Sequence, residues 1–342
     1  MIEVKNLVKR YGSHTAVDHL SFTIEKGQIY GFLGPNGAGK STTMNIMTGY
    51  LGATEGEVLI DGHDILEEPE KAKKCIGYLP EIPPLYTDMK VKEYLKFVAE
   101  LKEIDREKRT AEVERALFMT KLQDVENRLI RNLSKGYRQR VGLAQAIMGF
   151  PDIIILDEPT VGLDPKQIIE IRELIKELAK DHTVILSSHI LAEISAVCDY
   201  IMIISNGRLI ASDTPENLEK QMSGAGTLYL EVKTQKDNLQ NLLSGVQGLG
   251  KWSVEEKESS CIATIEEGEN ADPREELFYI CAQAGYPILM MQYKKASLEE
   301  VFLELTEAAR KEAEKVKNNR RLGERRRKKE QIKEEKEDEG SL

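Results

Sequence analysis

Residues 34–41 read Gly34-Pro35-Asn36-Gly37-Ala38-Gly39-Lys40-Ser41 and fit the phosphate-loop pattern G-x-x-x-x-G-K-[ST] at every required position. The alternating, β-rich stretch 28–33 before the motif predicts a strand, and residues 42–47 predict the start of a helix. A strand before the loop and a helix after it are the context that this motif requires. The segment therefore predicts a phosphate-binding turn inside an α/β fold.

The residue types of this loop suit a nucleoside triphosphate. Its glycines let successive backbone N–H groups turn toward phosphate oxygens, and the helix N-terminus adds the positive end of a dipole. Lys40 can reach the β and γ phosphates, while the Ser41 hydroxyl suits Mg²⁺. A Gly-rich turn without a ligand is the alternative, and the adjacent Lys40 and Ser41 argue against it. We therefore expect nucleotide contacts from residues 34–41 and from Thr42.

Composition narrows the class of protein. The 342 residues suggest about two domains, and 41% hydrophobic with 31% charged residues is typical of a soluble globular protein. No run approaches the length of a membrane span, and the first residues lack the basic and apolar regions of a secretory signal. The four cysteines show no metal or disulfide spacing. We therefore expect a cytoplasmic protein, and the net charge of −10 argues against general nucleic-acid binding.

Two further segments predict buried parallel strands. Ile153–Leu156 is short, continuous and β-branched and ends in Asp157-Glu158, and Thr183–Leu186 ends shortly before His189. Residues 168–178 between them predict a helix, so the unit is β-α-β in a doubly wound sheet. Such sheets bind ligands beyond the carboxyl ends of their strands. We therefore expect Asp157, Glu158 and His189 at the edge that carries the phosphate loop.

The remaining segments complete a first domain over residues 1–220. Residues 2–33 predict a β-rich platform, and helical periodicity from residue 87 predicts a helical insert over about 87–135. The domain closes with two strands around an Asn206-Gly207 hairpin turn.

The order of the motifs is more specific than any one of them. Leu133-Ser134-Lys135-Gly136-Tyr137 precedes Asp157-Glu158 by about twenty residues, and Gly162-Leu163-Asp164-Pro165 and His189 follow. This set resembles the nucleotide-binding subunit of ATP-binding cassette (ABC) transporters over residues 1–220. The resemblance implies a P-loop cassette: a doubly wound, mainly parallel sheet with an antiparallel β platform and a helical insert.

The resemblance also implies roles within one cassette. Asp157 would hold Mg²⁺ through water, and Glu158 would be the general base that polarises the attacking water. His189 would contact the γ-phosphate, and Tyr11 matches the aromatic residue that stacks on adenine. Taken singly, each residue also has an ordinary structural interpretation: Asp157 and Glu158 could cap a helix, and His189 could be a core residue.

Other matched residues imply a second copy. Ser134 and Gly136, within the signature formed by Leu133, Ser134, Lys135, Gly136 and Tyr137, would close over the γ-phosphate held by the partner cassette. Asp164 would link the two sites. The implied assembly is a dimer around two ATP molecules.

Two residues depart from the family pattern. Glu81 stands where a glutamine is common, and it would still reach Mg²⁺ or the water while adding a negative charge. Lys135 stands where a glycine is usual. Its side chain would either reach the phosphates of the opposite site or point into solvent, and the sequence favours neither.

A second domain is expected over residues 226–306. Its predicted order β-α-β-β-α-β suggests a ferredoxin-like α+β unit. The segment Ser297-Leu298-Glu299-Glu300-Val301-Phe302 contains a capping box and resembles the accessory domain of the drug- and multidrug-export branch of ABC cassettes. Such a domain would either sense a ligand or support the cassette dimer.

The tail, residues 307–342, is almost wholly charged. It is basic over Arg320–Lys329 and acidic over Glu334–Glu339. A solvated or partly helical tail is the simplest interpretation, and contact with anionic lipid headgroups is the alternative.

We therefore expect the ATPase subunit of an export-type ABC transporter, which binds ATP and Mg²⁺. It would lie at the inner face of the cell membrane through separate permease subunits, with Ile82–Tyr86 as the expected contact. A soluble ABC ATPase with a ribosomal or DNA-bound partner is the alternative, as is a non-catalytic regulatory binder. A small GTPase is disfavoured because no N-K-x-D motif occurs.

Overall fold

The chain, seen in a computed structural model, is described at residues 1–222, 227–266, 272–294, 299–300, 302–303 and 305–307. It folds into two compact units, residues 1–215 (the cassette unit) and 216–304 (the C-terminal unit). The first half of the expected capping box and almost all of the charged tail, including the basic segment 320–329 for which lipid contact was the alternative, lie outside the described residues.

The centre of the cassette unit is a six-stranded sheet in the order β10-β9-β3-β8-β7-β6. All neighbours pair in parallel except β10, which is antiparallel to β9. Every residue of β3, β7 and β8 is buried, as expected for central strands of a parallel sheet that is covered on both faces. The strands are β3 (Ile29–Leu33), β6 (Ile76–Leu79), β7 (Ile153–Leu156), β8 (Thr183–Ser188), β9 (Tyr200–Ser205) and β10 (Arg208–Asp213).

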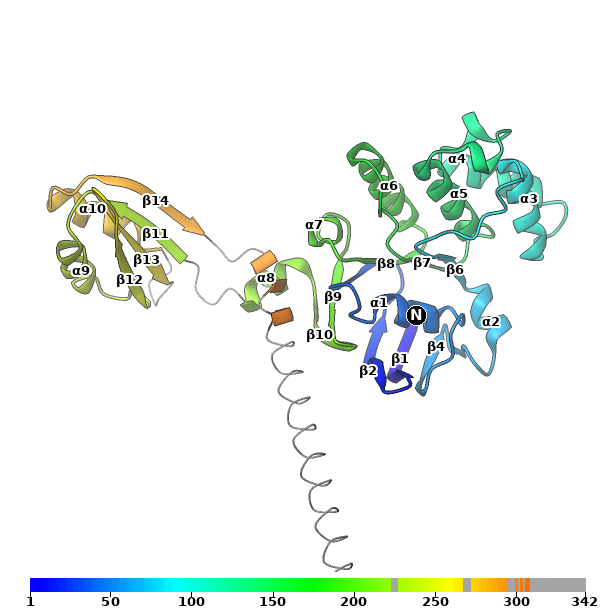
Figure 1. The fold of residues 1–342 in the computed structure, drawn as a ribbon, viewed down its shortest axis with the longest axis horizontal. Helices are drawn as coiled ribbons and strands as arrows, with labels where there is room; N and C mark the ends of the chain where they lie inside the picture. Colours follow the sequence, from blue (N-terminus) through cyan, green and yellow to red (C-terminus); the bar gives the residue numbers. More distant parts are fainter. Residues whose placement is uncertain (223–226, 267–271, 295–298, 301, 304, 308–342) are drawn as a thin grey trace, which may run out of the picture. The chain divides into compact units, whose positions relative to one another are not determined.

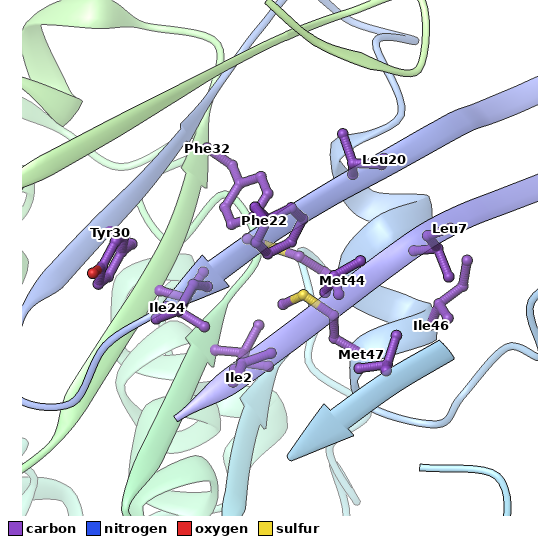
Figure 2. Packing of buried hydrophobic residues seen from close by; sticks show 14 of the residues in the cluster. Ile2, Leu7, Leu20, Phe22, Ile24, Tyr30, Phe32, Met44, Ile46 and Met47 are labelled. Atoms are coloured by element: carbon purple, nitrogen blue, oxygen red, sulfur yellow. The ribbon is translucent and has the colours of Figure 1, made fainter. Parts of the chain in front are cut away.

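A smaller antiparallel sheet forms a platform with strand order β2-β1-β4-β5. The range 2–33 predicted for the platform is wrong at its end, because β3 pairs within the central sheet and β4 and β5 complete the platform instead. Its strands are β1 (Ile2–Tyr11), β2 (His14–Ile24), β4 (Glu55–Ile60) and β5 (His63–Asp64). Helix α1 (Lys40–Met47) buries Met44 and Met47 against this sheet, where Figure 2 shows them among the platform's apolar side chains. Phe22 of β2 meets Phe32 of β3 edge to face at 5.3 Å. This core fixes the start of α1, and with it the phosphate loop.

Most helices of the cassette unit lie on the other side of the central sheet, where Figure 1 shows α3 to α6 opposite the platform. The spacing that predicted α3 is confirmed, because Val91, Tyr94, Leu95 and Val98 are all buried. In the described ranges no helix combines the length and apolarity needed to cross a membrane. The other helices of this unit are α2 (Pro69–Lys74), α3 (Val91–Leu101), α4 (Arg109–Met119), α5 (Lys135–Ile147), α6 (Pro165–Leu178) and α7 (Leu191–Ile194), with short 3-10 turns η1 (Gln123–Val125) and η2 (Ile130–Asn132). Helix α8 (Pro215–Met222) begins at residue 215, and its remaining residues belong to the C-terminal unit.

The C-terminal unit has the element order β11-α9-β12-β13-α10-β14, the β-α-β-β-α-β order expected from the sequence. Its sheet runs β12-β13-β11-β14 with every pair antiparallel. Leu239 and Leu243 of α9 and Leu277 of α10 are buried with the strands in one core. The elements are β11 (Thr227–Val232), α9 (Lys236–Ser244), β12 (Trp252–Glu256), β13 (Cys261–Glu266), α10 (Arg274–Gln283) and β14 (Ile288–Lys294).

Candidate functional site

A cavity of about 560 Å³ lies over the phosphate loop. The loop, the platform and the segments that follow β6, β7 and β8 all contribute to it, so residues far apart in sequence share one space. Its lining residues are Tyr11, His14, Ala16, Asn36, Gly37, Ala38, Gly39, Lys40, Ser41, Thr42, Glu81, Glu158, Val161 and His189.

The loop can take its path only because two positions lack a side chain. Gly39 caps α1 with φ of +105°, and a Cβ there would press on the carbonyl oxygen of Ala16 at 2.6 Å. A Cβ at Gly34 would clash with the backbone carbonyl of Ile204 in β9. The glycines therefore permit close contact between the loop and both sheets.

The ammonium group of Lys40 is held inside the loop. Its Nζ donates to the carbonyl oxygens of Gly34 at 2.8 Å and Pro35 at 3.4 Å. The same atom lies 3.6 Å from Oε1 of Glu158, and the Lys40 side chain is only 6% exposed. A buried positive charge thus faces the cavity beside a buried carboxylate.

Asp157, directly after β7, is bound by two hydroxyl groups. Ser41 Oγ donates to Asp157 Oδ1 at 3.1 Å, and Ser187 Oγ donates to the same oxygen at 2.6 Å. The predicted neighbourhood of Ser41 and Asp157 is therefore present. Ser187 was not assigned a role from the sequence, although its place at the end of a buried strand, two residues before His189, was a usable signal.

Glu158 has a backbone conformation that side-chain-bearing residues rarely adopt, with φ of +49°. Its N–H donates to Ser187 Oγ at 2.9 Å, and its Oε2 lies 3.0 Å from Nδ1 of His189. Because the carboxylate can only accept, Nδ1 carries the proton and donates it, and Nε2 remains as the second ring nitrogen. Backbone strain of this kind is common where a functional side chain must be aimed.

Glu81 and Tyr11 occupy the rim of the cavity. Glu81 also lines a second cavity of about 610 Å³ together with Ser41, Asp157 and Tyr78. Burial, reinforced by the charge of Asp157, raises the pKa of Tyr78 well above the usual range, so its phenol stays a donor and binds Asn45. The ring of Tyr11 is 49% exposed, which leaves a face open for stacking.

The signature segment does not line the nucleotide cavity of its own chain, as judged from the residues that the structure describes. Ser134 is the N-cap of α5 and accepts a hydrogen bond from Tyr137 N at 3.4 Å. Leu133 is buried, whereas Ser134 is exposed. The segment thus presents Ser134 and Lys135 at the surface, outside the cavity that Lys40 lines.

Lys135 and Asp164 belong to neighbouring surface segments. A Cβ at Gly162 would clash with Lys135 Nζ, so this ammonium lies against the Gly162 backbone. Asp164 caps α6 by accepting from Gln167 N at 2.9 Å, and Gln167 in turn packs on Gly136. Lys135 is exposed, and within its own chain its ammonium contacts the loop that carries Asp164; both alternatives expected from the sequence stay predictions.

The oxygen atoms of Ser41 and Asp157 suit Mg²⁺ better than a metal ion that needs three or more protein ligands. The described residues contain no group of three or more His, Cys, Asp or Glu side chains placed to hold a metal. Mg²⁺, however, is usually held by one or two protein oxygens together with substrate phosphates and water. A hydroxyl and a carboxylate oxygen 3.1 Å apart beside a phosphate loop supply that donor set.

Sequence reasoning missed other contributors to the cavity. The cavity is also lined by His14, Ala16 and Val161. His14 and Ala16 reach it only because the platform packs against the phosphate loop. Val161 follows Asp157-Glu158 closely in sequence, and this position was its one usable signal.

The likeness to known proteins agrees with this geometry. Residues 17–161 match the family model described as ABC transporter. The bacitracin transport ATP-binding protein BcrA of Bacillus licheniformis is 33% identical over 307 residues, 89% of this chain and 97% of BcrA. The linearmycin resistance ATP-binding protein LnrL of Bacillus subtilis (strain 168) is 32% identical over 313 residues, 90% of this chain and 98% of LnrL.

Solved structures agree as well. The dimeric post-hydrolysis state of the ATP-binding cassette MJ0796, bound to ADP and Pi, matches with a TM-score of 0.57 at 27% identity, over 63% of this chain and 98% of that one. Since BcrA and LnrL align over nearly their whole lengths and the fold is that of solved cassettes, this chain belongs to the ABC transporter family, as an ATP-binding subunit and an ATPase.

Proposed function

We propose that this chain is the ATP-hydrolysing motor of an export-type ABC transporter and drives transport through separate membrane subunits. The observation that carries the proposal is the convergence of Lys40, Glu158 and His189, from three separate segments, on one cavity. A merely binding protein has no need of a buried carboxylate there. The names of BcrA and LnrL, which refer to bacitracin transport and linearmycin resistance, favour export of antibiotic-like compounds.

In this proposal the loop residues 34–42 bind the phosphates of ATP, and Tyr11 stacks on the adenine. Lys40 neutralises charge on the β and γ phosphates. Ser41, Asp157 and Glu81 are the residues that would hold Mg²⁺, which would neutralise phosphate charge when bound. Glu158 takes the proton of the attacking water, and His189 contacts the γ-phosphate and keeps Glu158 in place through Nδ1. Positioning and charge are the main sources of catalysis in phosphoryl transfer.

A second copy completes the site. Ser134 and Gly136 lie outside the cavity of their own chain, among the described residues, and Ser134 is exposed at the N-terminus of α5. Backbone N–H groups at a helix N-terminus suit a phosphate that another chain presents. We propose that two cassettes face each other around two ATP molecules, with Asp164 linking the sites.

The membrane partner would dock beside the helical insert. A cavity of about 620 Å³ is lined by Pro84, Leu85 and Tyr86 from the segment after Glu81 and by α3 residues including Tyr94 and Phe97. Tyr86 is 59% exposed and meets Phe97 edge to face at 5.5 Å. An apolar groove next to Glu81 would transmit a change at the nucleotide to a short partner helix. This contact would hold the chain at the cytoplasmic face of the membrane.

Co-purification tests the transporter assignment. The tagged chain, expressed in its native host, should recover an integral membrane protein from detergent extracts. Replacing Leu85 and Tyr86 with Asp should abolish that recovery and spare ATP binding. Leu66→Asp, at a residue of similar exposure (57%), is the matched control and should keep the partner. Recovery of ribosomes without a membrane protein would instead favour a soluble ABC ATPase.

A further inference from the structure

Glu193 in α7 is a buried acidic side chain that does not line the nucleotide cavity. It is only 7% exposed. Its Oε2 accepts hydrogen bonds from Thr160 Oγ1 at 2.6 Å and from Ser188 Oγ at 2.9 Å. In the part of the chain that the structure describes, the ion pairs do not include Glu193. Two hydroxyl groups, and no cation, hold this carboxylate.

A buried carboxylate that no cation neutralises lowers the stability of the fold, so its presence calls for an explanation. Burial of a carboxylate costs free energy that hydrogen bonds only partly offset. The two hydroxyl groups indicate the role of Glu193, since one comes from the segment after β7 and the other from the end of β8.

Thr160 and Ser188 belong to the two segments that carry Glu158 and His189. Thr160 is two residues beyond Glu158, and Ser188 directly precedes His189. Ser188 Oγ also accepts from Ile190 N at 3.0 Å, which closes the turn around His189. One carboxylate oxygen thus ties the end of β8 to the segment after β7.

The segment around Glu158 needs such support, because its φ of +49° is unfavourable for a residue with a side chain. Ser187 holds it on one side through Glu158 N at 2.9 Å. Glu193 holds it on the other through Thr160. Strained conformations persist when surrounding contacts over-determine them, and these two anchors do so.

We propose that Glu193 is a positioning residue for ATP hydrolysis. Its carboxylate holds Thr160 and Ser188 together. This clamp keeps Glu158 Oε2 and His189 Nδ1 3.0 Å apart. The inference rests on the roles proposed for Glu158 and His189 and adds a residue that touches neither the nucleotide cavity nor its ligand. Lys40 and the loop glycines bind phosphate independently of this clamp. Loss of the clamp should therefore lower kcat and leave the KM for ATP unchanged.

The test compares Glu193→Ala with Glu193→Gln in the full chain, with steady-state ATPase kinetics. The Ala variant should lose about 10- to 100-fold in kcat, the range that small misplacements of catalytic groups produce, while KM stays within about twofold. The Gln variant should recover most of the rate, because its amide oxygen can accept a hydrogen bond from one hydroxyl group and its NH₂ group can donate one to the other. Glu231→Ala is the matched control: this carboxylate accepts from Ser260 Oγ at 2.7 Å in the C-terminal unit, and its loss should not affect turnover.

Several results would overturn the proposal. They are a kcat of Glu193→Ala within about twofold of the wild type, an effect on KM alone, or a Gln variant as slow as the Ala variant. If Glu193→Ala does not fold, Thr160→Val carries the test under the same criteria, since it keeps the side-chain shape and removes the donor. Glu158→Gln in parallel separates the two hypotheses. A wild-type rate in Glu158→Gln would remove the base role, whereas a slow Glu158→Gln beside a fast Glu193→Ala would reject only the clamp.

Discussion

Glu158 and His189 follow two neighbouring parallel strands, and their side chains meet with Oε2 3.0 Å from Nδ1. The other carboxylate oxygen, Oε1, lies 3.6 Å from Lys40 Nζ. Both oxygens of one buried carboxylate are thus engaged, one by the phosphate loop and one by the histidine. A change in either partner should therefore alter the position of the Glu158 carboxylate, the group that the first prediction tests directly.

Glu158→Gln should leave ATP binding intact and lower turnover by about 10²-fold or more, because a base is removed and the shape is kept. Phosphate release measures the rate, and equilibrium binding measures the affinity. The variant should also accumulate as an ATP-dependent dimer in light scattering. Glu177→Gln, on the surface of α6, is a neutral control. Turnover close to the wild-type rate in Glu158→Gln would exclude this residue as the base.

The second prediction concerns the site shared between two copies. A crosslinked heterodimer of a Ser134→Arg chain and a Lys40→Ala chain should retain one intact composite site, since both lesions fall in the other. It should trap one nucleotide, whereas either mutant homodimer should trap none. Bound nucleotide per dimer is the measurement. Equal trapping by all three dimers would mean that the signature acts within its own chain.

The third prediction compares two glycines of the phosphate loop. Gly34→Ala drives a methyl group into the Ile204 carbonyl, whereas a Cβ at Gly37 meets nothing within 4 Å and suffers only from φ of +80°. We expect Gly34→Ala to destabilise the cassette by about 2 kcal/mol or more, as overpacking does. Gly37→Ala should cost only about 1 kcal/mol. Urea unfolding with and without ATP measures both. A larger loss in Gly37→Ala would contradict the steric account.

The fourth prediction is a pH dependence that arises from Lys102. Its Nζ donates to the carbonyl oxygens of Met148 at 2.7 Å and Ala146 at 3.3 Å near the end of α5. Although Lys102 is exposed as a residue, desolvation of its ammonium group lowers the pKa from 10.5 to about 8. Between these values the unfolded chain holds a proton that the folded chain has released, so stability rises with pH across this window and is constant below it.

Relative to Lys102→Met, the wild type should gain free energy of unfolding between pH 8 and pH 10.5, on the order of 1 kcal/mol, because solvent at this exposed residue screens the effect of the lowered pKa. Urea unfolding of both proteins across this range is the measurement, and the variant subtracts the contribution of all other groups. Parallel pH profiles for the two proteins would show that Lys102 keeps an ordinary pKa.

Local patterns were sufficient for much of the fold. The strand Ile153–Leu156 and the helical periodicity that begins the insert follow from residue types and spacing alone. The helix expected from residue 168 begins at Pro165 instead, because Asp164 caps it through Gln167 N. Helix caps depend on the conformation of one residue, and a periodic pattern does not record it.

The sequence by itself determined the phosphate loop and the strands that end at the same edge of the sheet. It also predicted Lys40, Asp157, Glu158 and His189 as candidate site residues. Each of these features depends on neighbours along the chain. Only the tertiary structure decided that Ser187 bridges Asp157 and Glu158, that Glu193 joins Thr160 to Ser188, and that Lys135 rests on Gly162. Apart from the contact between Ser188 and Glu193, these contacts join residues about 30 positions apart. They exist because β7 and β8 pair side by side and α5 packs beside the loop before α6, and hydrogen bonds of such short range depend on where the backbones lie in space.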